Sequence, residues 1–94
     1  MTLEIISPEK VFFKGEIDMV IVPGGKGQFT ILPQHAAIIS TLIEGDIIYV
    51  INEKDNHLAI KSGFVEVHND VVTICVEQLA ATDAADNNKK ENKE

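Results

Sequence analysis

Short apolar runs that alternate with polar residues recur along most of the chain, and this pattern limits the fold more than any other feature. An apolar side chain at every second position is typical of a β-strand with one buried face, and closely spaced Gly, Pro, Asn and Asp residues mark the strand ends. We therefore predict an all-β protein. The predicted strands are residues 3–7, 11–14, 17–22, 29–32, 37–42, 47–52, 57–61, 64–68 and 71–77.

Turn-forming residues stand between these segments. Residues 7–10, 44–46, 53–56 and 69–70 contain side chains that favour tight turns or positive φ. Ser62 and Gly63 are interpreted as a turn between two strands rather than as the site of a nucleophile. Successive strands are then mostly antiparallel hairpins. Because an open sheet would leave an apolar face in water, we expect an antiparallel β-sandwich or flattened barrel.

The composition changes at the C-terminal end. Residues 1–79 form one predicted β-sandwich domain, whereas residues 80–94 contain no apolar side chain larger than alanine. Such a segment buries too little surface to order itself, so we predict a disordered polar tail. A domain of this size is only modestly stable, and a permanent partner would stabilise it.

Charge and composition exclude several functions. The formal net charge is −7 and all basic residues are lysines, which disfavours nucleic acid as a partner because arginine is the preferred phosphate-binding residue. No apolar run approaches the roughly 20 residues that span a bilayer, so no direct bilayer insertion is expected. The N-terminus has no basic signal-like region. Cys75, the only cysteine, is expected to be a buried strand residue in a protein of a reducing compartment.

The sequence contains no recognisable motif for a phosphate-binding, metal or catalytic site. Residues 23–27 read Pro-Gly-Gly-Lys-Gly but lack the Walker spacing, so a chain-reversing turn is favoured over a phosphate site. His35, His57 and His68 have no metal-site spacing. We therefore predict no catalytic residue, no cofactor, no metal and no small-molecule substrate.

Three blocks of sequence carry a resemblance to a known family. The first combines LEIISPE (3–9), FKGE (13–16) and VIVPG (20–24). The second combines GQFTILPQHA (27–36) and LIEG (42–45), and the third combines SGFVEV (62–67) and VVTI (71–74). In this order and spacing, the chain resembles the sandwich domain of the epsilon subunit of bacterial and chloroplast ATP synthases, which corresponds to the delta subunit in mitochondria.

The resemblance implies two five-stranded sheets and a non-catalytic place in the rotor stalk of a proton-translocating F-type ATP synthase. The implied partners are the gamma subunit and the membrane ring, with the catalytic head in the same complex. The implied site is the cytoplasmic face of the bacterial plasma membrane, where the protein is peripheral. Relatives usually continue into two helices that can block hydrolysis, and we expect this chain to support coupled ATP synthesis without that inhibitory hairpin.

Candidate contact residues follow by position. The implied ring-facing residues are Gly24, Gly25, Lys26, Gly27, Gln28, Pro33, Gln34, His35 and Ala36. Many relatives have an acidic residue in place of Gln28 and a glycine in place of Gln34. His35 is either a contact or a turn residue whose ring caps a backbone group.

The gamma contact is expected around four apolar residues, which the pattern also allows to be core. They are Ile39, Leu42, Ile43 and Ile48. The alternative function is a free-standing β-sandwich that binds a peptide or sugar. It finds little support, because such sites usually expose aromatic side chains.

Overall fold

The computed structural model describes residues 1–80, and these contain strands and no helix. The all-β prediction is therefore confirmed. The predicted tail lies outside the described residues, apart from Ala80. The strands are β1 (Thr2–Ile6), β2 (Val11–Glu16), β3 (Met19–Gly24), β4 (Gly27–Ile31), β5 (Ile38–Leu42), β6 (Gly45–Ile51), β7 (Lys54–His68) and β8 (Val71–Leu79).

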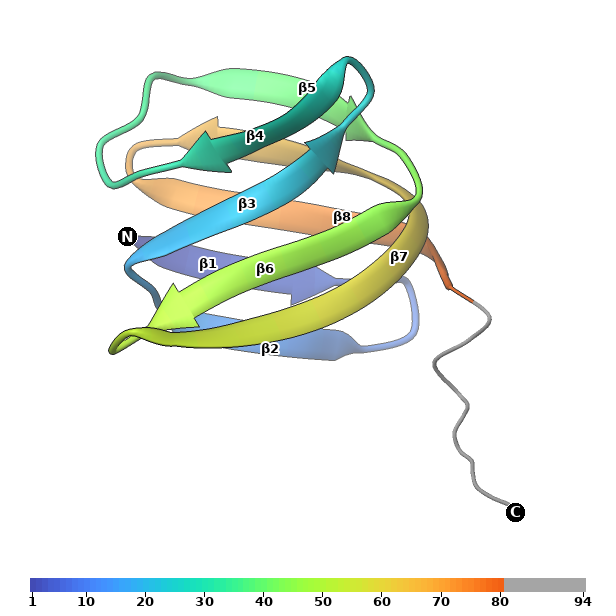
Figure 1. The fold of residues 1–94 in the computed structure, drawn as a ribbon, viewed down its shortest axis with the longest axis horizontal. Coiled ribbons are helices and arrows are strands. Elements are labelled where there is room, and N and C mark those ends of the chain that lie inside the picture. The colour runs from blue at the N-terminus through green and yellow to red at the C-terminus, as the bar shows by residue number, and fades with distance from the viewer. Residues whose placement is uncertain (81–94) are drawn as a thin grey trace.

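The strands form two layers, which are joined by β7 and by a pair between Gly24 on β3 and Leu42 on β5 (Figure 1). The C-terminal part of β7 pairs with β5 and β8, and the sheet continues through β1 to β2. The N-terminal part of β7 pairs with β6, which pairs with β3, and β4 lies at the edge. All pairs are antiparallel except β1 with β8, where Thr2 lies beside Val71.

The long strand β7 corrects the sequence prediction at one place. Segments 57–61 and 64–68 belong to a single strand of 15 residues, so the predicted turn at Ser62-Gly63 is wrong. The register with β8 shifts at these residues, which marks a β-bulge where the strand passes from one layer to the other. Residues 1–80 thus contain eight strands, not the ten that two five-stranded sheets require.

Two tight turns use the left-handed region of backbone space. Asn52 and Glu53 connect β6 to β7, and Asn69 and Asp70 connect β7 to β8; all four residues have φ between 51° and 68°. Two consecutive positive φ values are typical of the type I′ turn that matches the twist of a hairpin. The first turn therefore comes earlier than the predicted 53–56 segment, whereas the 69–70 turn is confirmed.

The core lies between the layers. Alternating positions of both layers point inward, and no polar side chain of the described residues is fully buried. The buried apolar residues are Leu3, Ile5, Ile17, Val20, Val22, Ile31, Leu42, Ile47, Ile60, Val65, Val67, Val72, Ile74 and Val76. Close packing of such side chains resists deformation, so the sandwich holds its surface loops on a rigid frame.

Candidate interaction surfaces

The glycine-rich candidates form the tip of the β3–β4 hairpin. Gly24 pairs with Gly27, and Gly25 and Lys26 lie between them at the tip. The Gly25 N–H donates to the Thr41 carbonyl at 3.2 Å, and the Ile43 N–H donates to the Pro23 carbonyl at 2.9 Å. These bonds attach the hairpin to β5 and to the residue after it. The antiparallel pairing of β3 with β4 confirms the predicted chain-reversing turn.

A surface hollow lies between this hairpin and β5. Its volume is about 590 Å³. Its lining brings five ring-facing candidates together with one gamma candidate, Ile39. The lining residues are Gly24, Gly25, Lys26, Gly27, Gln28, Phe29, Ile39, Ser40 and Thr41.

Glycine is required in this hairpin for two reasons. A Cβ atom on Gly24 would lie 2.7 Å from the Phe29 ring and 2.8 Å from the Gly27 carbonyl oxygen, closer than atoms pack. Gly27 has φ +127°, which other residues rarely adopt, although the space beside it is open. The hairpin therefore presents backbone rather than side chains, except at Lys26 and Gln28, which are both exposed.

The Pro33–Ala36 candidates lie at the opposite end of β4 from the glycine hairpin (Figure 1). Gln34 has φ 66°, and its N–H donates to Asp70 Oδ1 at 2.7 Å, which holds the loop against the β7–β8 turn. His35 Nδ1 lies 2.8 Å from the Ala36 carbonyl oxygen. This contact is the one that the turn interpretation of His35 predicts, whereas a contact of His35 with a partner stays a prediction.

The four gamma candidates do not form one patch. Ile39 and Ile43 are 76% and 51% exposed on and just after β5. Ile48 is half-buried on β6, in the other layer. Leu42 is only 3% exposed and belongs to the core, so its side chain is not available to a partner. The alternative that these residues are core thus holds for Leu42 alone among the four.

An apolar row on the outer face of the layer that contains β5, β7, β8 and β1 was missed from the sequence. Phe64 pairs with Cys75 and Cys75 with Ile6, so these outward side chains form a continuous row across three strands. Thr41, which pairs with Phe64, extends the row onto β5 with a hydroxyl group. Phe64 is 38% exposed. The alternation within residues 64–68 contained the signal, since Phe64 shares its face with Glu66 rather than with Val65.

Cys75 lies in this row, half-buried, and not in the core as expected. Burial raises the pKa of its thiol, and the carboxylates of Glu66, Glu4 and Glu77 raise it further. Because the thiolate is the nucleophilic form, this environment disfavours reactions of the Cys75 thiol.

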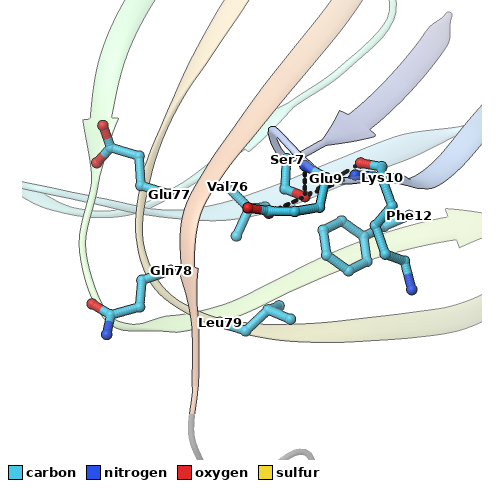
Figure 2. A pocket seen from close by; sticks show the side chains of 8 residues that line it. All are labelled: Ser7, Glu9, Lys10, Phe12, Val76, Glu77, Gln78 and Leu79. Atoms are coloured by element: carbon cyan, nitrogen blue, oxygen red, sulfur yellow. Dashed lines mark hydrogen bonds between the residues drawn. The ribbon is translucent and has the colours of Figure 1, made fainter.

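A smaller hollow lies between the β1–β2 turn, the start of β2 and the end of β8. Figure 2 shows it between Phe12 on β2 and Val76 to Leu79 on β8. The Ser7 hydroxyl accepts the backbone N–H of Glu9 and of Lys10, and Lys10 Nζ lies 4.9 Å from the centre of the Phe12 ring. Its volume of about 220 Å³ is below the roughly 300 Å³ at which small-molecule sites begin.

The N-terminal corner contains the main ion pairs. The Met1 ammonium lies 3.2 Å from Glu16 Oε1 and 3.5 Å from Asp70 Oδ2. The hydrogen bond to Glu16 raises the pKa of this ammonium, and the hydrogen bond from the Thr2 hydroxyl lowers the pKa of Glu16. These groups are exposed and tie β1 to β2 and to the β7–β8 turn, which is a structural role.

Metal and membrane sites were also sought in residues 1–80. Within that range, no three His, Cys, Asp or Glu side chains gather closely enough to hold a metal ion. Nor does it include a helix with the length and apolar character needed to cross a membrane.

The sandwich and its loops match a known family. A family model described as "ATP synthase, Delta/Epsilon chain, beta-sandwich domain" matches residues 1–82. The chain belongs to this family. The resemblance found in the three sequence blocks is therefore confirmed, and it covers the whole sandwich.

Two relatives named as ATP synthase epsilon chains are similar to this chain over most of its length. A relative from Leptospira borgpetersenii serovar Hardjo-bovis (strain JB197), named "ATP synthase epsilon chain", is 37% identical over 86 residues, which are 92% of this chain and 68% of the relative. A relative of the same name from Desulfitobacterium hafniense (strain DSM 10664 / DCB-2) is 45% identical over 73 residues, 78% of this chain and 55% of the relative. The chain spans only part of these curated relatives.

Solved structures share the fold. A chain in the Euglena gracilis mitochondrial ATP synthase, described as OSCP/F1/c-ring, superposes with a TM-score of 0.76 at 20% identity and covers 83% of this chain and 51% of that one. A chain in the Tetrahymena thermophila enzyme, described as central stalk/c-ring, gives 0.71 at 19% identity and covers 97% and 75%. Both support the epsilon-type sandwich.

Proposed function

We propose that the chain is a non-catalytic subunit of the central stalk of a bacterial F-type ATP synthase, which links the gamma subunit to the membrane ring and supports coupled ATP synthesis. The observation that carries this proposal is the family match over residues 1–82, which includes the complete sandwich. The named relatives are ATP synthase epsilon chains, and one structural neighbour is described as central stalk and c-ring.

The proposed action is mechanical. Torque passes between gamma and the ring, and the sandwich prevents slip between them because its close-packed core resists deformation. The loops on this frame make the contacts. The subunit would then act at the cytoplasmic face of the plasma membrane without entering the bilayer.

Two separate surfaces suit two partners. The edge strand β4 has the glycine hairpin at one end and the Pro33–Ala36 loop at the other, so a single flat partner along this edge can touch both candidate segments. We assign this β4 edge to the ring. The outer row with Phe64 is an exposed apolar surface in the other layer, and we assign it to gamma.

The test is a mild-detergent purification of the tagged chain from its own cells, with mass spectrometry of the proteins that accompany it. We expect gamma and ring subunits together with the catalytic head. Recovery of the chain alone, or with unrelated proteins, would overturn the proposal.

A pair of variants tests the surface assignment. Phe64→Asp should reduce recovery of gamma from the soluble head, because it places a charge in an apolar contact. Leu32→Asp is the matched control, since Leu32 is 53% exposed beside the β4 edge and away from the outer row. Equal loss of gamma in both variants would contradict the assignment.

A further inference from the structure

The Pro33–Ala36 loop begins with a turn of defined local shape. The His35 N–H donates to the Leu32 carbonyl at 3.1 Å, which closes a β-turn. Pro33 occupies the second position of this turn, and Gln34, with φ 66°, occupies the third. A proline followed by a residue of positive φ is typical of a type II turn. This local geometry fixes the shape of the turn, but it does not fix the direction of the turn relative to the sandwich.

One hydrogen bond attaches this turn to a distant part of the fold. The bond that closes a β-turn joins the first carbonyl to the fourth N–H, so the N–H of the third residue needs another acceptor. The Gln34 N–H donates to Asp70 Oδ1 at 2.7 Å. Among the hydrogen bonds that residues 33–37 make within the described part of the chain, only this one leaves the β4–β5 connection. Asp70 is therefore the group that can set the direction of the loop.

Asp70 itself is held at the end of the sandwich. It lies in the β7–β8 turn with φ 63°, and its carbonyl oxygen accepts the Thr2 N–H at 3.1 Å. Val67 and Val72, on either side of this turn, are buried in the core. The turn, the N-terminus and the β4–β5 loop lie at the same end of the molecule (Figure 1). The core thus fixes the carboxylate from which the loop is held.

Both carboxylate oxygens of Asp70 have partners inside the protein. Oδ1 accepts the Gln34 N–H, and Oδ2 lies 3.5 Å from the Met1 ammonium. A hydrogen bond from an N–H to an ionised oxygen is roughly twice as strong as one between neutral groups. A carboxylate engaged in this way acts on a binding partner through the loop that it holds, rather than by direct contact.

We propose that Asp70 is a positioning residue for the ring contact, whose carboxylate orients the exposed Pro33–Ala36 loop before the ring binds. This inference rests on the proposed function and adds a residue from another turn to its contact machinery. A loop that already has its binding conformation avoids the entropy that is otherwise lost on association. Loss of the bond to Asp70 should therefore weaken ring binding although every side chain of the loop remains.

Asp70→Gly is the variant that separates this bond from the turn. Glycine adopts φ 63° without strain, and Asn-Gly is a preferred type I′ pair, so the β7–β8 turn should form as before. The bond from the Gln34 N–H is lost. Asp70→Asn keeps an acceptor oxygen for that N–H and should behave like the wild type in the loop.

The first measurement is the order of the loop backbone in the full chain, from nitrogen-15 relaxation at Gln34, His35 and Ala36. The wild type and Asp70→Asn should give order parameters of about 0.85, the value of rigid backbone, and Asp70→Gly should fall below about 0.6. Unchanged order in Asp70→Gly would overturn the proposal, because the carboxylate would then not hold the loop.

The second measurement is binding of the labelled chain to the purified membrane ring in detergent, and separately to the gamma-containing head that lacks this subunit. If the freed loop has its binding conformation for roughly one fifth of the time, Asp70→Gly should bind the ring about 5-fold more weakly. Asp70→Asn should restore ring binding. Binding to the head should be the same in all three proteins.

Asp18→Ala is the matched control. It removes a bond of the same kind, in which the Asn52 N–H donates to Asp18 Oδ2 at 2.9 Å. That bond supports the β6–β7 turn, which contains none of the candidate contact residues. We expect Asp18→Ala to lose stability while the order of the Pro33–Ala36 loop and the binding to the ring stay at wild-type values.

The outcomes separate the two proposals. If Asp70→Gly binds the ring as tightly as the wild type, the positioning role is wrong while the proposed function stands. An equal loss of ring binding in Asp70→Gly and Asp18→Ala would also overturn it, because the effect would then reflect general stability. If the wild type binds neither the ring nor the head, the proposed function fails and this inference fails with it.

Discussion

Glycine serves different purposes in two regions of this molecule, the crossing point of β7 and the tip of the β3–β4 hairpin. At Gly63, which is buried, a side chain would overlap the backbone carbonyl oxygen of Cys75 on β8. At Gly27 there is open space, and the requirement comes from φ +127°. The first glycine allows two strands to approach, whereas the second shapes an exposed surface. Substitutions should therefore affect the fold in one region and mainly the contact surface in the other.

The largest effect is expected for Gly63→Ala. The added methyl group would clash with backbone atoms of Cys75 and Val76, which paired strands hold in place. Overpacking of this kind lowers the free energy of unfolding by about 3 kcal/mol. Urea unfolding would measure the loss. Gly15→Ala is the control, because its methyl would lie 3.2 Å from the Phe13 ring, a side chain that can move. Equal stability of the two variants would show that the crossing point does not require glycine.

Leu42→Ala should have the next largest effect. Leu42 pairs with both Gly24 and Gly63, so it lies between the two regions, and its side chain is buried. Its truncation should lower the free energy of unfolding by about 2.5 kcal/mol. Ile39→Ala, three residues earlier and 76% exposed, should change it by less than about 0.5 kcal/mol. Similar losses in the two variants would disprove the division of β5 into a core face and a contact face.

Gly27→Ala should cost about 1 kcal/mol, because the strain of a positive φ remains even though the space is open. The companion variant Gly25→Ala has no such φ and should cost less. Thermal unfolding of both proteins compares them directly. A larger loss in Gly25→Ala would mean that packing against Thr41, rather than backbone torsion, limits the hairpin.

Gln34→Gly should be stabilising. Gln34 has φ 66°, which glycine adopts without a Cβ penalty, so we expect a gain of about 0.7 kcal/mol. The hydrogen bond to Asp70 uses the backbone N–H and survives the change. Gln28→Gly, at a strand position without positive φ, should instead lose stability. A stability loss in Gln34→Gly would contradict the torsional explanation.

The smallest effect is expected at the exposed N-terminal corner, away from both glycines. The pKa of Glu16 is lowered by its hydrogen bond from Thr2 and by the Met1 ammonium. Its stabilising contribution is therefore present above the ordinary pKa of glutamate and is lost as the pH falls through the lowered pKa. Glu16→Gln should be slightly less stable than wild type at pH 7. Unfolding midpoints measured at successively lower pH should converge, and a constant difference would contradict this origin.

The fold class was predictable because alternation and turn residues are local signals. The exception, the division of β7 at Ser62-Gly63, has a physical cause. Ser-Gly is typical of a turn, but Gly63 is needed because Cys75 lies against it, and Cys75 is distant in the sequence. The same limit applies to the number of strands, since a strand shared by two layers looks like two strands.

The contact surfaces were predictable only in part. The glycine hairpin was found because its composition is unusual, and the structure places Ile39 beside it. Leu42 was chosen as a contact candidate because an apolar residue at a strand end can face either the core or the solvent. Residues 39 and 42 lie on opposite faces of β5, so an exposed Ile39 implies a buried Leu42. Phe64 was missed although the alternation within residues 64–68 places it on the same exposed face as Glu66.

The parallel pairing of β1 with β8 brings together the first and last strands of the described chain, with Thr2 beside Val71. Such long-range pairing slows folding, because the entropy of closing a long loop is lost before the contacts form. During synthesis, one edge of β1 stays unpaired until β8 has left the ribosome. Until then, the nascent chain depends on β2 to cover the other edge of β1, and a ribosome that stalls before Leu79 releases an incomplete sheet.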